Sequence, residues 1–124
     1  MQQEEIIKVS SERDVEEGAV VSHCQQQEIS LAEFADRFAR RVVQGYAGGE
    51  YNYGYCDGAM NWLFGFMTGD LFLESNGNTL PDYASEAYIA FDSGEYPHAA
   101  DGADVDPVAR YTDPAVAVLL SLDH

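Results

Sequence analysis

Lysine and arginine are scarce in this chain, and they are missing entirely from residues 42–109. The chain has 6 of them against 22 Asp and Glu, which gives a net charge of −16 and an isoelectric point near 4.1. The negative electrostatic field of such a chain repels nucleic acid and anionic membranes, and phosphate binding would need basic side chains. The composition therefore argues against direct nucleic-acid binding and favours a basic protein surface as partner. Charge that serves solubility alone is the alternative interpretation.

Cysteine and long hydrophobic runs are equally scarce. Cys24 and Cys56 are far apart in the sequence and form no disulfide framework. Because the chain also lacks a signal-like start, we expect two reduced thiols in a cytoplasmic protein. No apolar run approaches the roughly 20 residues of a membrane-spanning helix, so we expect no membrane association.

The residue patterns of common catalytic and metal sites are missing as well. The histidines are His23, His98 and His124, and no C-x-x-C or H-x-x-x-H spacing occurs. Residues 101–106 lack the ligand order of a calcium loop, and no glycine-rich phosphate loop is present. We therefore expect no metal, no cofactor and no enzymatic activity. A nucleophilic pair of Cys56 and His98 stays open as an alternative, although a buried structural cysteine is commoner.

The residues that are present predict a globular helical protein. Hydrophobic residues make up 46% of the 124 positions and aromatic residues 12%, enough for a core in a single domain spanning residues 1–124. Apolar residues recur at spacings of three and four in several segments. The predicted fold is mostly α, a compact bundle of four to five helices.

The clearest predicted helix covers residues 30–46. Ser30 and Glu33 have the spacing of a capping box, in which the serine oxygen accepts a hydrogen bond from a backbone N–H at the helix start. Glu33 and Arg37 have the spacing of a favourable i,i+4 pair. The Gly48-Gly49 pair predicts the end of the helix. One apolar face follows from seven residues: Leu31, Phe34, Ala35, Phe38, Val42, Val43 and Tyr46.

A second predicted helix begins at Asp57 as its cap and runs to about Glu74. Apolar residues cover nearly every side of it, which is typical of a helix in the centre of a bundle. Gly65 and Gly69 predict close packing of neighbouring helices. One of these glycines is also expected to break the helix into two pieces.

The remaining segments are less regular. Residues 1–26 are expected to be less ordered, and residues 4–9 fit either a frayed helix or a short strand. Thr79 is expected to cap a helix that ends at Gly94. Residues 95–111 predict a long acidic loop, because they contain many carboxylates together with proline and glycine. A short helix is expected to end the chain.

Tyrosines lie among the carboxylates of the cation-free stretch. Tyr51, Tyr53 and Tyr55 are flanked by Glu50 and Asp57. Tyrosine is a favoured residue at interfaces, but alternating tyrosines also fit the edge of a core, and both interpretations stay open. The candidate partner-binding residues are Glu50, Tyr51, Tyr53, Tyr55, Asp57, Asp92, Glu95, Tyr96, Asp101, Asp104 and Asp106.

Two segments resemble a known family. Residues 27–38 (QEISLAEFADRF) and residues 57–64 (DGAMNWLF) are similar to the capped helix and the following helix of bacterial immunity proteins of the colicin-D-immunity-like kind. The resemblance implies a small acidic helical protein that binds and blocks a nuclease toxin domain. The alternative is a phage anti-CRISPR or anti-restriction protein that mimics nucleic acid. In both cases carboxylates would occupy the positions of substrate phosphates.

Overall fold

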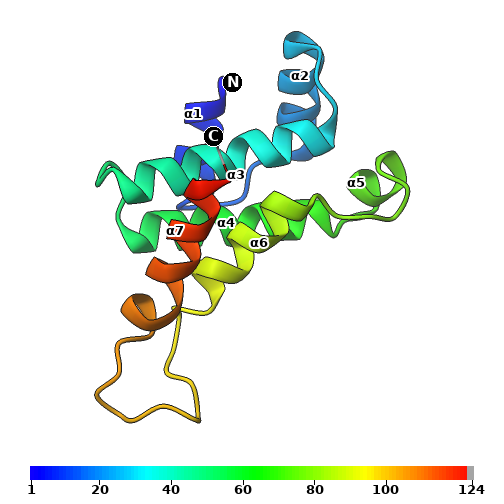
Figure 1. Cartoon of the computed structure of the whole chain (residues 1–124). Helices are drawn as coiled ribbons and strands as arrows, with labels where there is room; N and C mark the ends of the chain where they lie inside the picture. Colours follow the sequence, from blue (N-terminus) through cyan, green and yellow to red (C-terminus); the bar gives the residue numbers. More distant parts are fainter. Residues whose placement is uncertain (123–124) are drawn as a thin grey trace.

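The computed structural model describes residues 1–122, and helices are the only regular elements in that range (Figure 1). The prediction of a mostly α fold is confirmed. The expected count of four to five helices is too low, and the alternative of a strand within residues 4–9 is wrong. The elements are α1 (Gln3–Ser10), α2 (Glu17–Gln27), α3 (Leu31–Ala47), α4 (Tyr53–Met67), α5 (Asp70–Ser75), α6 (Asp82–Asp92), the π-helical turn η1 (Val108–Thr112) and α7 (Asp113–Ser121).

Helix α3 forms for the local reasons that the sequence contains. The Ser30 hydroxyl oxygen accepts a hydrogen bond from the Glu33 N–H at 3.0 Å, so the predicted cap is confirmed. The Glu33 carboxylate pairs with Arg37 at 3.0 Å. Phe34, Phe38 and Val42 are fully buried on the apolar face. Strong amphipathicity and a side-chain cap together define this helix.

Helix α4 begins earlier than the sequence analysis expects. The Asn52 side chain accepts a hydrogen bond from the Tyr55 N–H at 2.8 Å, so Asn52 is the cap and Asp57 lies one turn inside the helix. The prediction of Asp57 as the cap is wrong because Asn is an equally good cap and occurs five residues before it. The predicted break at a glycine is confirmed, since extended backbone at Gly69 separates α4 from α5.

Helix α6 receives its cap from another helix. The Asp36 carboxylate of α3 accepts a hydrogen bond from the Ala84 N–H at 3.2 Å, in the first turn of α6. Thr79 instead donates its hydroxyl to the Asn76 carbonyl at 2.7 Å, so the prediction that Thr79 caps this helix is wrong. A carboxylate at a helix N-terminus satisfies an unpaired N–H and is favoured by the helix dipole.

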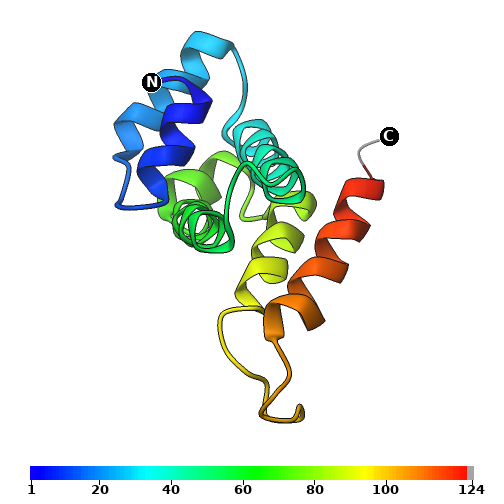
Figure 2. The same ribbon diagram turned by 90° about the vertical axis from the view of Figure 1, so that its left-hand side faces the viewer.

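The N-terminal residues contribute to the core. Residues 1–26 were expected to be less ordered, and the structure forms α1 and most of α2 there, with Ile6 and Ile7 fully buried. Helix α1 approaches α4 closely at Gly58, where a Cβ atom would lie 2.6 Å from the Ser11 carbonyl oxygen. Only glycine permits this approach. Figure 2 shows α1 and α2 on one side of the central pair α3 and α4, and α6 with α7 on the other.

The predicted acidic loop is real but shorter than expected. Residues 95–107 project from the body of the molecule (Figure 1), whereas the last residues of the predicted loop lie in η1, which continues into α7. The buried Thr112 hydroxyl of η1 donates to the Ala90 carbonyl of α6 at 2.7 Å. This contact fixes where the loop ends. Within residues 1–122, no helix has both the length and the apolar character needed to cross a bilayer.

Candidate functional site

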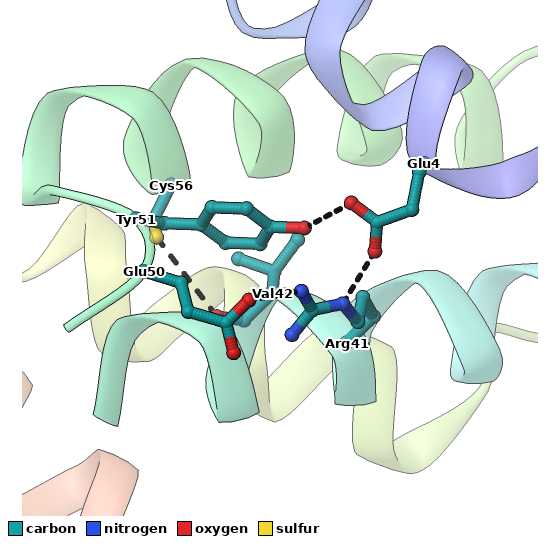
Figure 3. A network of polar contacts seen from close by, with 6 residues as sticks. All are labelled: Glu4, Arg41, Val42, Glu50, Tyr51 and Cys56. Atoms are coloured by element: carbon teal, nitrogen blue, oxygen red, sulfur yellow. Dashed lines mark hydrogen bonds and ion pairs between the residues drawn. The ribbon is translucent and has the colours of Figure 1, made fainter. Parts of the chain in front are cut away.

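Two of the predicted partner-binding residues, Glu50 and Tyr51, make contacts with Arg41 of the same chain (Figure 3). The Arg41 guanidinium donates to Glu50 at 2.6 Å and also pairs with Glu4 of α1. The Tyr51 hydroxyl donates to the same Glu4 carboxylate at 2.6 Å, and the Tyr51 ring lies 4.8 Å from the Arg41 guanidinium carbon. The side chains of Glu50 and Tyr51 therefore join α1, α3 and the start of α4.

The pKa values in this network follow from its hydrogen bonds. Burial raises the pKa of Glu4, but hydrogen bonds from Tyr51 and Arg41 outweigh that effect and hold it below its usual value. Burial raises the pKa of Tyr51, and its hydrogen bond to Glu4 raises it further. Glu4 is therefore an anion at neutral pH while Tyr51 keeps its proton. The Arg41 guanidinium thus lies between the carboxylates of Glu4 and Glu50 and pairs with both.

The three clustered tyrosines lie at the edge of the core. Tyr51, Tyr53 and Tyr55 are all half-buried and pack against core residues. The Tyr53 hydroxyl donates to the Phe91 carbonyl of α6, and the Tyr55 ring stacks on Tyr51 with centroids 4.5 Å apart. These contacts correspond to the edge-of-core interpretation of the cluster. Part of each tyrosine also remains exposed.

Three of the predicted carboxylates lie close together where the N-terminal part of α4 meets the C-terminus of α6 and the residues that follow it. The amide of Asn61 donates to Glu95 at 3.2 Å and approaches Asp57 at 3.5 Å. Burial of Asp57, a hydrogen bond with Glu95 and the negative charges of Glu95 and Asp92 together raise the pKa of Asp57 to about 7. Burial and the charge of Glu95 also raise the pKa of Asp92. We call Asp57, Asp92 and Glu95 the carboxylate cluster.

Burial and the negative charges of Glu95 and Asp92 disfavour ionisation of Asp57 in the carboxylate cluster. With its pKa raised to about 7, Asp57 is partly protonated near neutral pH, and one of its oxygens, Oδ1, is buried without a hydrogen-bond partner among the described residues. Like charges at close range cannot all ionise at their usual pKa values. A cation brought to this position would relieve the repulsion. The sequence contains all three residues, but it does not show that they meet.

The acidic loop divides into residues with internal partners and residues that face solvent. Asp101 accepts a hydrogen bond from the Tyr111 hydroxyl, and Asp106 accepts one from the Val108 N–H at 3.0 Å. Tyr96 is 59% exposed and Asp104 is exposed. Asp101 and Asp106 therefore shape the loop, whereas Tyr96 and Asp104 present their side chains outward.

The three arginines of α3 are also engaged with their own chain. Arg37 pairs with Glu33, and the Arg40 guanidinium carbon lies 4.5 Å from the centroid of the Tyr83 ring. Together with Arg41, these are half of the chain's lysines and arginines, and all three belong to α3. The consequence for the surface is that much of the positive charge is neutralised locally.

The pair Cys56 and His98 has separate surroundings. The Cys56 thiol is fully buried near the Val42 carbonyl, and burial raises its pKa to about 12. The His98 ring stacks on Tyr111 with centroids 3.9 Å apart and bonds the Ser93 carbonyl at 2.8 Å. Residues 1–122 contain no group of three metal-ligating side chains with suitable geometry. His124 lies outside the described residues.

A groove along α4 is a feature that sequence analysis missed. It has a volume of about 340 Å³ and lies between α4 and the connection from α1 to α2, with Asp14, Glu17, Trp62, Gly65 and Phe66 in its lining. The signal in the sequence is Gly65 beside Phe64 and Phe66, but the spacing of Gly65 and Gly69 predicts close helix packing and not a groove.

The chain matches no protein-family model, and neither a curated protein nor a solved structure is detectably similar to it.

Proposed function

We propose that this protein is a non-enzymatic inhibitor, an immunity protein that binds and blocks the basic substrate cleft of a nuclease toxin in the bacterial cytoplasm. The observation that carries the proposal is the stretch of residues 42–109, which contains eleven carboxylates and no lysine or arginine. Opposite fields on two proteins accelerate their encounter and select against wrong partners.

The arrangement of the charges supports this function. The arginines of α3 are engaged by Glu33, Tyr83 and Glu4, so they do little to offset the charge of the remaining surface. In the carboxylate cluster like charges repel, so a basic side chain of the toxin that binds there relieves the repulsion and lowers the free energy of the complex. In the proposed complex, carboxylates occupy positions that substrate phosphates take in the toxin.

The test begins with the tagged protein as bait in a lysate of its native host, followed by mass spectrometry. The proposal requires a basic nuclease whose activity and toxicity fall when the protein is added. Affinity should decrease as salt rises from 50 to 500 mM, because the screening length shortens from about 14 Å to about 4 Å. Nucleic acid should compete with the protein for the partner. Capture of a partner that binds equally well at both salt concentrations would contradict the proposal.

Genomic context and partner identity separate this function from the phage alternative. A toxin gene beside the coding sequence supports immunity, and a nucleic-acid-binding defence complex as partner supports an anti-CRISPR or anti-restriction role. Co-expression with the toxin provides the direct measurement. Cells that carry both genes should grow, and cells that carry the toxin alone should not.

A further inference from the structure

The groove along α4 has an aromatic floor. The rings of Trp62 and Phe66 stack with centroids 5.4 Å apart and an angle of 14° between their planes. Phe66 is 7% exposed, whereas Trp62 is half-buried and lines the groove. Phe38 supports the indole ring from within the core, with centroids 5.6 Å apart. The floor is therefore a fixed aromatic surface with one accessible ring.

Gly65 leaves this floor uncovered. It was expected to allow close helix packing, but a Cβ atom added there would meet no atom within 4 Å. At Gly58, two turns earlier on the same side of α4, an added Cβ would collide with the Ser11 carbonyl. Packing thus explains Gly58 and does not explain Gly65, where glycine weakens the helix relative to alanine. Its effect at this position is to keep the groove open.

Carboxylates rim the groove. Asp14 and Glu17 line it and are exposed, and the arginine ion pairs described above involve other carboxylates, namely Glu4, Glu33 and Glu50. Asn61 lies at the same groove and donates to Glu95 of the carboxylate cluster. Arg13 lines the adjoining hollow rather than this groove. The rim is therefore negative, while the floor is aromatic.

We propose that this groove, which we call the Trp62 groove, receives an arginine side chain of the basic partner. The guanidinium lies flat on the Trp62 ring and pairs with Asp14 and Glu17. This assignment rests on the proposed function, because it names the contact that a basic partner makes here. Arginine fits better than lysine, because its planar group stacks on aromatic rings and pairs with carboxylates through two parallel hydrogen bonds. A nucleic-acid base would also stack, but its phosphates are repelled by the rim.

The groove can be tested without knowledge of the partner, because Trp62 is the chain's single tryptophan. The probes are the N-acetyl amides of arginine, lysine and citrulline at constant ionic strength. The readouts are Trp62 fluorescence and the one indole N–H signal in the NMR spectrum. Arginine should give a saturable change, lysine should bind several times more weakly, and uncharged citrulline should give no change. An equal response to citrulline and arginine would overturn the assignment, and so would no response to arginine.

A variant that fills the groove links the test to the partner. Gly65→Leu places a side chain over the floor at a position where a helix former is tolerated, so its melting temperature should not fall. Its response to the arginine probe should disappear, and its Kd for the captured nuclease should rise at least tenfold. The matched control is Gly18→Leu, since Gly18 is another exposed helical glycine with open space around it that does not line the groove.

The outcomes of this test and of the function test can be told apart. If no basic nuclease is captured, the proposed function fails, and the arginine titration still decides whether the groove binds a guanidinium. If a nuclease is captured and Gly65→Leu binds it as tightly as the parent does, the groove assignment is wrong while the inhibitor function stands.

Discussion

The first 41 residues and the next 68 use charge in opposite ways. Residues 1–41 contain nine carboxylates and five of the six cations, whereas residues 42–109 contain eleven carboxylates and no cation. In the first region two carboxylates pair with arginines of the same region, Glu4 with Arg41 and Glu33 with Arg37. In the second region Asp57 instead lies near other carboxylates, Glu95 and Asp92.

Carboxylates that lie close together, as in the second region, lower the stability of the fold at neutral pH. An ion pair at a partly exposed position contributes a fraction of a kcal/mol, and a network contributes more. Crowded carboxylates instead hold a proton at neutral pH or repel one another. A basic side chain beside the carboxylate cluster would relieve this repulsion, and this is one reason why we propose a basic partner. Four experiments test whether the two regions differ in this way.

The largest effect is expected on partner association. Replacing the exposed Glu95 and Asp104 by lysine changes the charge of the cation-free stretch by +4 without removing the internal bonds of Asp101 and Asp106. The association rate at low salt should fall on the order of tenfold to a hundredfold, because steering is lost. Stopped-flow mixing with the captured nuclease measures it.

The matched control for this variant is Glu5→Lys with Glu28→Lys, which makes the same charge change on exposed residues of the first region. Its association rate should change much less. If both variants slow association equally, only net charge matters, and the cation-free stretch is not the binding face.

The second effect concerns the paired charges of the first region. Arg41→Met removes the cation that joins Glu4 and Glu50 and leaves two carboxylates near each other. The free energy of unfolding should decrease by about 1–2 kcal/mol, because a network and a cation–π contact are lost together. Urea denaturation measures the change. Arg37→Met is the control, because its single exposed pair with Glu33 should contribute less than about 0.5 kcal/mol.

The third effect is a gain in stability, expected when a carboxylate is removed from the second region. Asp57 has a folded pKa of about 7 against a usual 3.8, so between these values the folded state binds more protons than the unfolded chain does. This site therefore stabilises the fold at low pH and loses that contribution as pH rises through about 7. Asp57→Asn should raise stability at pH 8 on the order of 1 kcal/mol, after allowance for screening at a partly exposed position.

Melting curves from pH 4 to pH 8 measure this effect. The parent should lose more stability than Asp57→Asn as pH rises across that window. Identical pH profiles for the two proteins would mean that the carboxylate cluster carries no strain.

The smallest effect is expected for Cys56→Ala with His98→Ala. The two side chains have different partners, the Val42 carbonyl for the thiol and Tyr111 with Ser93 for the ring. Inhibition of the captured nuclease should not change, and EDTA should alter neither helicity nor the melting temperature. Loss of inhibition by a variant that keeps its fold would revive the nucleophilic pair as a catalytic site.

Several elements were predictable because their causes are local. The start of α3 depends on Ser30 and a backbone N–H three residues later, so the sequence contains the whole interaction. The break between α4 and α5 depends on a single glycine, Gly69. The prediction for α4 was wrong at its start, because Asn52 and Asp57 are equally good caps and the sequence offers no way to choose between them.

The candidate site was predictable only as a set of residue types. The abundance of carboxylates and tyrosines in residues 50–106 was evident, but the contacts of Tyr51 with Glu4 and of Tyr53 with Phe91 join residues 47 and 38 positions apart. The Trp62 groove was missed for the same reason. Its rim comes from the connection between α1 and α2 and from the first residue of α2, and its floor comes from α4.

The sequence by itself determined the helical class, the limits of α3 and the sign of the field, because composition, apolar spacing and side-chain caps act within a few residues. The tertiary structure decided which charges meet. It placed Asp36 at the start of α6, Arg41 between two carboxylates, and Asp57 beside Asp92 and Glu95. These pairings depend on how helices pack, since electrostatic energy follows distance in space and not separation along the chain.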